Sequence, residues 1–185
     1  MYAEGNKTIV LIGARASGKS SVGRLLAERT DFAFVDTDEL ISERVNASIS
    51  TIVSDHGWHH FRALEKQALA EVLTRSNHVI ATGGGAVLHE TLFAGHRDHT
   101  LVVWLNAETQ ELIDRIQSDS NSCQSRPSLT GTDVVTEFEA VYEARKPLYE
   151  RLSHFIINTT HLDREQIVAD ILSVIDLDQG LAAPK

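Results

Sequence analysis

Residues 13–20 read Gly13-Ala14-Arg15-Ala16-Ser17-Gly18-Lys19-Ser20 and fit the pattern G-x-x-x-x-G-K-[ST] at every position. A β-branched apolar run precedes them over residues 7–12, and apolar residues at helical spacing follow over residues 21–29. In such a strand–loop–helix context the backbone N–H groups point inward, and the positive end of the helix dipole attracts phosphate oxygens. At average glycine content, a chance match is expected in about one chain in a hundred. The stretch therefore predicts a nucleotide phosphate site, in which Lys19 reaches the β- and γ-phosphates and Ser20 ligates Mg²⁺.

The composition fits one acidic domain. At 185 residues the chain is long enough to bury a core without covalent help. Its 17 Lys and Arg residues against 26 Asp and Glu residues give a formal charge of -9, which disfavours a nucleic-acid partner. The single cysteine, Cys123, rules out an internal disulfide and fits a reducing compartment. We find neither a signal sequence nor a membrane-length apolar run, so we expect no membrane partner and a cytoplasmic location.

Strands and helices are predicted to alternate along the chain. Apolar runs predict further strands over residues 32–35, 78–81, 100–105 and 155–157. Periodic segments predict helices over residues 39–45, from Ser48 or Ser50 to a break at Gly57, and over 58–75, 88–95, 108–117, 133–149 and 164–176. Residues 177–185 are expected to fray. Helices between parallel strands cover both faces of a sheet, so we predict an α/β fold with three layers, α/β/α, around a five-stranded parallel sheet.

Residues 118–132 break this pattern, because Ser, Asn, Asp, Pro and Gly are concentrated there without periodicity. The segment is either a mobile surface loop or a lid, since loops of this length inside compact domains are often functional. Arg126 lies within it and offers a cation that either folds over phosphates or stays solvated.

The carboxyl ends of parallel strands meet at one edge, where such sheets bind ligands. That edge collects the glycine loop, Asp36 and Asp38, three consecutive glycines over residues 83–85, and residues 158–159. Alternation along an extended segment predicts that the two aspartates point to the same side, where one holds Mg²⁺ through water and the other orients and deprotonates a hydroxyl. The alternative is a strand-end turn in which Asp38 or Thr37 caps the next helix.

Two arginines and the glycine run suit an anionic ligand. Arg62 can grip a carboxylate with two parallel hydrogen bonds, although spacing alone favours a surface ion pair with Glu65 or Glu39. Arg145, near a helix end, is open to the same two interpretations as Arg126, a cation of the site or a solvated side chain. Three consecutive glycines at a strand end are entropically costly, and the usual reason to keep them is close approach of a ligand to the backbone.

Taken in order, these segments resemble the shikimate kinase family over residues 8–175, nearly the whole chain. The motifs are Gly-x-x-x-x-Gly-Lys-Ser over 13–20, Asp-Thr-Asp over 36–38, Phe-Arg at 61–62 followed by Glu65, Ala-Thr-Gly-Gly-Gly-Ala over 81–86, Arg-Pro-Ser-Leu-Thr-Gly over 126–131 and Arg-Lys-Pro-Leu-Tyr over 145–149. Segments 58–62 and 126–131 are most similar to the type II branch. The resemblance implies a P-loop fold like that of the nucleoside monophosphate kinases. It also implies a single domain over 1–185, with a core over 7–176, a mobile lid over about 118–132 and a substrate-binding helical region over about 37–66.

The resemblance implies ATP-dependent phosphorylation of the 3-hydroxyl of shikimate, a step toward chorismate and the aromatic amino acids. The catalytic residues that it implies are Lys19, Asp38 as the base, and Arg126. Those implied to bind shikimate are Asp38, Arg62, Gly83, Gly84, Gly85 and Arg145. Those implied to bind ATP are Gly13, Ala14, Arg15, Ala16, Ser17, Gly18, Lys19, Ser20, Ser21, Arg115, Arg126 and Asn158. Mg²⁺ would be held by Ser20 and, through water, by Asp36.

Two other functions remain open at this point. Another small-molecule kinase of the same build, such as a gluconate kinase or a nucleoside monophosphate kinase, shares the loop and lid but lacks the Asp-Thr-Asp, Phe-Arg and Gly-Gly-Gly set. A catalytically silent nucleotide-binding module would keep the fold, although Lys19, Asp38 and Arg126 together speak against it. Arg15 and Ser17 depart from the family's usual residues, but they fill variable positions of the loop pattern. The expected ligands are ATP and shikimate, bound by a monomer.

Overall fold

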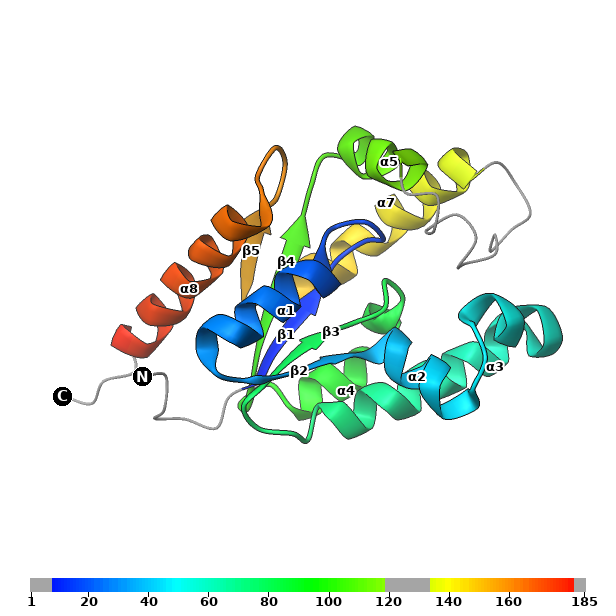
Figure 1. The fold of residues 1–185 in the computed structure, drawn as a ribbon, viewed down its shortest axis with the longest axis horizontal. Coiled ribbons are helices and arrows are strands. Elements are labelled where there is room, and N and C mark those ends of the chain that lie inside the picture. The colour runs from blue at the N-terminus through cyan, green and yellow to red at the C-terminus, as the bar shows by residue number, and fades with distance from the viewer. Residues whose placement is uncertain (1–7, 119–133, 182–185) are drawn as a thin grey trace.

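The computed structural model describes residues 8–118 and 134–181. In Figure 1 the strands lie between two layers of helices. Arg126, Cys123 and all but the first residue of the expected lid lie outside the described residues. The interpretation of that segment as a lid therefore stays a prediction.

The sheet has five parallel strands in the order β2-β3-β1-β4-β5. Their bounds are Thr8–Ile12 for β1, Ala33–Asp36 for β2, His78–Ala81 for β3, Thr100–Asn106 for β4 and Phe155–Asn158 for β5. The predicted five-stranded parallel sheet is confirmed, and each strand lies within one residue of its expected bounds. Because β1 is the central strand, the glycine loop that follows it sits in the middle of the carboxyl edge.

The helices are α1 (Lys19–Thr30), α2 (Thr37–Val45), α3 (Ile49–Val72), α4 (Glu90–Gly95), α5 (Thr109–Ser118), α7 (Val134–Leu152) and α8 (Arg164–Leu181), with a short 3₁₀ helix η1 (Ala86–Leu88). The backbone of α3 breaks at Gly57, as predicted, with φ 79° and ψ 167°. The prediction of a frayed tail is wrong over residues 177–181, which continue α8. No proline interrupts them, and extending a formed helix costs little.

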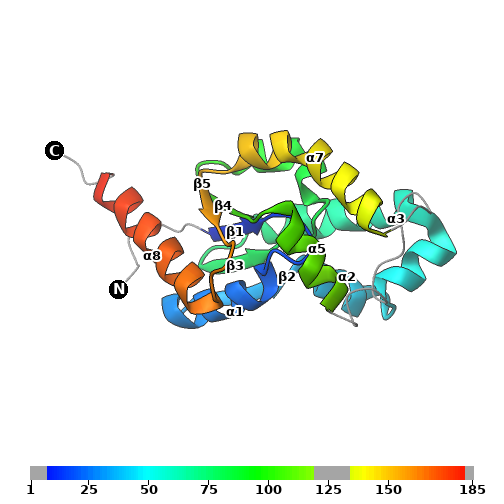
Figure 2. The same cartoon turned by 90° about the horizontal axis from the view of Figure 1, so that it is seen from above.

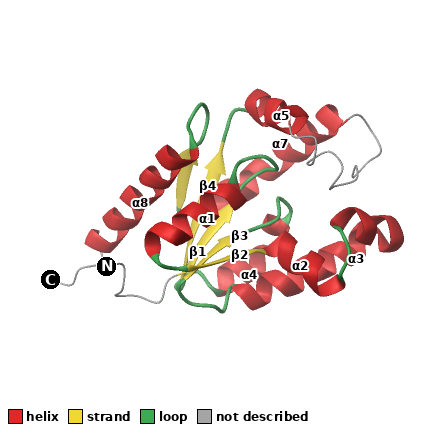
Figure 3. Cartoon of the chain, viewed as in Figure 1, coloured by secondary structure: helices red, strands yellow, loops and turns green. Residues whose placement is uncertain are grey.

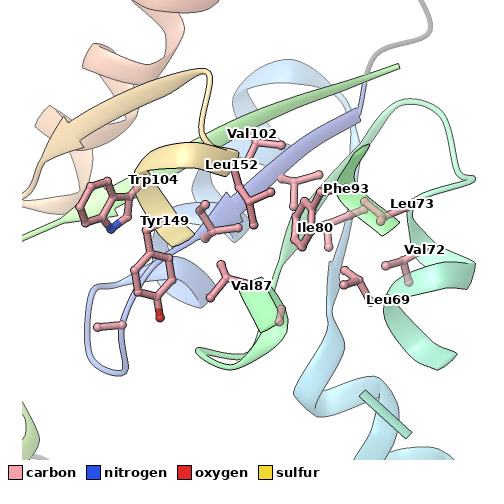
Figure 4. Close-up of a cluster of buried hydrophobic side chains, with 14 of the residues drawn as sticks. Leu69, Val72, Leu73, Ile80, Val87, Phe93, Val102, Trp104, Tyr149 and Leu152 are labelled. Atoms are coloured by element: carbon pink, nitrogen blue, oxygen red, sulfur yellow. The ribbon is translucent and has the colours of Figure 1, made fainter. Parts of the chain in front are cut away.

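Each face of the sheet has its own hydrophobic core. Alternate residues of β1 serve the two cores: Leu11 packs with α1 and α8, and Val10 packs with α3, α4 and α7. Figure 2 shows α7 on one side of the sheet and α1 with α8 on the other. Figure 4 shows the second core, in which the ring of Tyr149 stacks on Trp104 at 5.6 Å between centroids. The predicted three layers are confirmed.

A third apolar cluster joins α2 to α3 beside the carboxyl edge. Its members include Ile41 of α2 and Ile52, Phe61 and Ala68 of α3. Figure 3 shows these two helices packed together beyond the ends of β2 and β3. This packing fixes the two helices that follow Asp36 to each other. Within the described residues, no helix is long and apolar enough to cross a membrane.

Candidate active site

The glycine loop links β1 to α1, as its sequence predicts. Gly13 has φ 149°, and a β-carbon there would lie 2.6 Å from the carbonyl oxygen of Leu105 and 2.8 Å from Ser17 Oγ. Gly18 has φ 91°, a backbone that side-chain-bearing residues rarely adopt, and it directly precedes α1. The loop therefore needs glycine at both positions for its path. The loop leads directly into the N-terminus of α1, and the helix dipole at such an end favours an anion.

Lys19 folds back over this loop. Its ammonium donates to the carbonyl of Ala14 at 2.6 Å and lies 3.2 Å from Ser17 Oγ. The side chain is largely buried, at 9% exposure for the residue. These contacts hold the cation within the loop, in position to meet an entering phosphate.

Asp36 connects the loop to α2. Its Oδ2 accepts a hydrogen bond from the Ser20 hydroxyl at 2.5 Å, so the predicted pair of metal-site residues is brought together. Its Oδ1 accepts from the backbone N–H of Asp38 at 2.9 Å and of Glu39 at 3.4 Å, which makes Asp36 the N-cap of α2. The predicted alternation of Asp36 and Asp38 along an extended segment is therefore wrong, because Asp38 is already helical. The alternative, a cap at Asp38 or Thr37, is wrong as well.

The glycine run over residues 83–85 is approached by the protein's own side chains. A β-carbon at Gly83 would lie 2.6 Å from Asp38 Oδ1 and 2.9 Å from Glu65 Oε1, and one at Gly85 would overlap Arg62 Nη1. The backbone N–H of Gly83 also donates to Thr37 Oγ1 at 3.0 Å. These contacts bring Asp38 and Arg62 to the same short loop, although they lie on different helices.

Gly84 makes the link to α7. Its carbonyl accepts hydrogen bonds from the Tyr149 hydroxyl at 2.7 Å and from Arg145 Nη1 at 3.1 Å. A β-carbon at Gly84 would make only ordinary contacts, the nearest at 3.6 Å from the backbone nitrogen of Arg15. Close approach therefore explains the glycines at the two ends of the run, whereas the middle one contributes its carbonyl.

Arg62 forms the ion pair that its spacing suggested, but not at the surface. Its Nη1 lies 2.6 Å from Glu65 Oε2, and the Glu65 side chain is only 1% exposed. The guanidinium also lies against the rings of Trp58 and Phe61, at 5.2 and 5.4 Å from their centroids. The alternative partner, Glu39, pairs instead with Arg24 at 2.5 Å.

The electrostatics around Arg145 favour an anion. Burial lowers the pKa of the Arg145 guanidinium, and the positive charge of Arg62 lowers it further. Burial also raises the pKa of Tyr149 to about 12. Two cations that repel each other across one loop gain from an anion that contacts both.

Arg115 and Asn158 lie together near the glycine loop. Arg115 Nη2 donates to the carbonyl of Thr159 at 3.0 Å, its Nη1 lies 3.4 Å from the carbonyl of Ala16, and it also pairs with Glu111. Asn158, the residue before Thr159, is the last residue of β5. The structure therefore brings these two predicted residues to one side of the loop. Arg126, the remaining predicted residue, lies outside the described part of the chain.

Sequence reasoning missed several supporting residues. Thr37 and Tyr149 both lie within family motifs, Asp-Thr-Asp over 36–38 and Arg-Lys-Pro-Leu-Tyr over 145–149. Their positions in these motifs could have identified them as residues of the site. His89 has no such signal, because its partner Glu65 lies 24 residues away.

Where residues are described, no group of three or more His, Cys, Asp or Glu side chains could hold a metal. A metal at Ser20 and Asp36 would therefore need water or ligand oxygens to complete its coordination.

Comparisons with known proteins point to one family. The family model described as shikimate kinase matches residues 15–176. Curated relatives named shikimate kinase 2 include one from Photorhabdus laumondii, which is 40% identical over 170 residues, 92% of this chain and 96% of that protein. Another, from Yersinia enterocolitica, is 37% identical over 91% of this chain and 95% of its own.

Solved structures give the same result. The shikimate kinase from Acinetobacter baumannii in complex with shikimate has a TM-score of 0.85 at 28% identity, covering 93% of this chain and 94% of its own. The enzyme from Aquifex aeolicus has a TM-score of 0.78 at 28% identity, covering 95% and 99%. A gluconokinase from Sinorhizobium meliloti, at 17% identity and a TM-score of 0.57, shares the fold alone.

Proposed function

The chain belongs to the shikimate kinase family and is an ATP-dependent kinase of shikimate; from this premise we propose how its residues divide the reaction. One observation carries the proposal. Asp38, Arg62 and Arg145 converge from three helices on residues 83–85, at the same sheet edge as the phosphate loop. We call this group the acceptor side.

Shikimate is an anionic polyol, and the acceptor side has a group for each of its features. Arg62 and Arg145 bind the carboxylate, because two guanidinium groups on one loop supply the paired donors that a carboxylate accepts. Asp38 accepts hydrogen bonds from the ring hydroxyls, while backbone groups of residues 83–85 complete the contacts. The net charge of -9 repels anions, so an anionic substrate needs cations placed locally at its binding site.

ATP is bound by residues 13–21, with the phosphates in the loop and Lys19 on the β- and γ-phosphates. Arg115 and Asn158 lie on the adenine side. Arg126 is proposed to contact the transferred phosphoryl group, on the strength of the Arg-Pro-Ser-Leu-Thr-Gly motif. These assignments place the nucleotide and the acceptor on adjoining parts of the carboxyl edge.

Mg²⁺ suits the pair formed by Ser20 and Asp36. Both supply oxygen, which this ion prefers, and their oxygens lie 2.5 Å apart. We propose that Ser20 holds the ion directly and Asp36 through water. When bound, Mg²⁺ neutralises charge on the phosphates of ATP.

In the reaction, Asp38 takes the proton of the 3-hydroxyl while that oxygen bonds to the γ-phosphorus. The bond from the γ-phosphorus to the bridging oxygen breaks, and the electron pair leaves with ADP. Phosphoryl transfer through a loose transition state depends chiefly on positioning and charge neutralisation. Lys19 supplies positive charge, and the two arginines fix the ring relative to Asp38.

We also propose the larger organisation implied by the family. The whole chain acts as one domain with a core over residues 7–176, a substrate-binding helical region over 37–66 and a lid over 118–132. The apolar cluster between α2 and α3 supports treating the helical region as a unit. The enzyme is proposed to be a cytoplasmic monomer without nucleic-acid or membrane partners.

A coupled ADP-release assay tests the proposed acceptor. We expect ADP release that depends on shikimate and requires Mg²⁺, with little release for gluconate or nucleoside monophosphates. Quinate, which also carries a carboxylate and ring hydroxyls, measures how finely the acceptor side discriminates. ADP release with none of these compounds would exclude the kinase activity.

A further inference from the structure

His89 is a buried polar group that the reaction described above does not use. It follows η1, directly after the glycine run, and its side chain is only 12% exposed. Its Nε2 lies 3.2 Å from Glu65 Oε2, the oxygen that also accepts from Arg62 Nη1 at 2.6 Å. A single carboxylate oxygen on α3 therefore joins Arg62 to His89, the residue between η1 and α4.

The chemistry of this contact fixes the role of each atom. A carboxylate paired with arginine is ionised and can only accept, so His89 Nε2 must carry the donated hydrogen. The charged groups that the structure gives around this contact are Glu65 and Arg62, with Arg145 and Asp38 close by. A carboxylate with 1% exposure also needs donors, because an ion buried without them is costly.

Arg62 is confined on its other sides. Its Nη1 lies so close to Gly85 that a β-carbon there would overlap it, and the rings of Trp58 and Phe61 flank the guanidinium. The position of Glu65 Oε2 then decides which way the remaining N–H groups of Arg62 point. His89 is a second donor to the same oxygen. It holds that oxygen in place and shares its negative charge with Arg62.

We propose that His89 is a positioning residue for the substrate carboxylate, acting through Glu65 on Arg62. The inference rests on the proposed role of Arg62 in binding that carboxylate. Without the His89 donor, Glu65 Oε2 turns toward Arg62, and the guanidinium no longer presents its other N–H groups to the ligand. The consequence is weaker binding of shikimate with an unchanged phosphoryl-transfer step.

The experiment compares His89→Ala with His89→Gln, whose amide places a donor near the position of Nε2. We expect His89→Ala to raise the shikimate KM roughly 5- to 20-fold, with kcat and the ATP KM within about two-fold of the parent. His89→Gln should recover most of the loss. His99→Ala serves as the matched control, because that side chain is exposed.

Two further measurements separate positioning from a general structural defect. With methyl shikimate, which lacks the anionic group, the difference between the parent and His89→Ala should disappear. In an Arg62→Ala background, His89→Ala should add nothing. His89→Asn, whose amide ends short of Glu65, repeats the test if the alanine variant fails to fold.

The outcomes distinguish the two proposals. If Arg62→Ala raises the shikimate KM and His89→Ala leaves it unchanged, the role of His89 is wrong and that of Arg62 stands. An effect of His89→Ala that persists with methyl shikimate, or adds to that of Arg62→Ala, also overturns the positioning role. If Arg62→Ala leaves the KM unchanged, both assignments fail together.

Discussion

The phosphate loop and the acceptor side are built in different ways. The loop is one continuous stretch whose function comes from its backbone path. Gly13, Ala16 and Gly18 have positive φ, and the Lys19 ammonium is folded inside. The acceptor side takes side chains from α2, α3 and α7 and holds them against residues 83–85 through buried polar contacts. We infer that substitutions in the phosphate loop and substitutions in the acceptor side should change different kinetic constants.

The largest effect is expected for Lys19→Ala. Removing this cation takes away charge that stabilises the phosphoryl group in transfer, and kcat should fall by about 10³-fold. The shikimate KM should change by less than about three-fold, because the hydrogen bonds of the Lys19 ammonium to Ala14 and Ser17 lie within the phosphate loop. Steady-state kinetics measure both constants, with the exposed Lys66→Ala as control. A large rise in the shikimate KM would show that the halves are not separable.

Arg62→Ala should produce the opposite pattern. Loss of this cation should weaken shikimate binding by roughly 2–5 kcal/mol, because the substrate carboxylate loses a partner and the buried Glu65 loses its ion pair with Arg62. Calorimetric titration with shikimate and with an ATP analogue measures the two affinities. Arg44→Ala is the matched control, since Arg44 makes an exposed ion pair with Glu71. An unchanged shikimate affinity would remove Arg62 from the carboxylate site.

Gly85→Ala tests the close approach of Arg62 to the glycine run. The new β-carbon would overlap Nη1, so the guanidinium must move, and we expect the shikimate KM to rise about 10- to 100-fold. Gly95→Ala is the control, because a β-carbon there meets no atom within 4 Å. If Gly85→Ala and Gly95→Ala had the same kinetics, Arg62 would have moved without loss of shikimate binding. The close approach of Arg62 would then not be the reason for a glycine at position 85.

The last prediction concerns the stability of the fold at high pH and not the kinetics. Burial raises the pKa values of Tyr142 and Tyr149 to about 12, above their ordinary value of 10.0. Below pH 10 both phenols keep their protons in the folded and the unfolded chain, so this contribution to stability is fully present. Between pH 10 and 12 only the unfolded chain releases them, and the free energy of unfolding should fall by at most about 1.4 kcal/mol per pH unit for each tyrosine.

Denaturant titrations at pH 9 and pH 11 measure this slope. Tyr149→Phe should reduce it by about half, because one of the two phenols is then absent. An identical slope in the variant would show that Tyr149 does not contribute. The same variant leaves the Gly84 carbonyl with Arg145 as its remaining donor and so weakens a support of the acceptor side.

Most of the fold followed from local pattern. The five strands were placed within one residue because apolar runs, glycines and helical periodicity are properties of neighbouring residues. The phosphate loop was predictable for the same reason. Local pattern failed at Asp38, whose backbone N–H donates to the N-cap Asp36. Helix α2 therefore begins at Thr37, two residues before its expected start, and the extended segment ends there. Local pattern failed again beyond residue 176, where α8 continues.

The sequence by itself determined the phosphate loop, the parallel sheet and the kinds of side chain available to an acceptor. Only the tertiary structure decided how those side chains meet. The contact between Glu65 and His89 spans 24 residues, and that between Gly84 and Arg145 spans 61. Such contacts depend on how α3, α7 and the ends of the strands pack, which no local pattern encodes. The physical reason is that a loop binds phosphate through its own backbone, whereas a carboxylate site needs charges from distant segments held in one buried place.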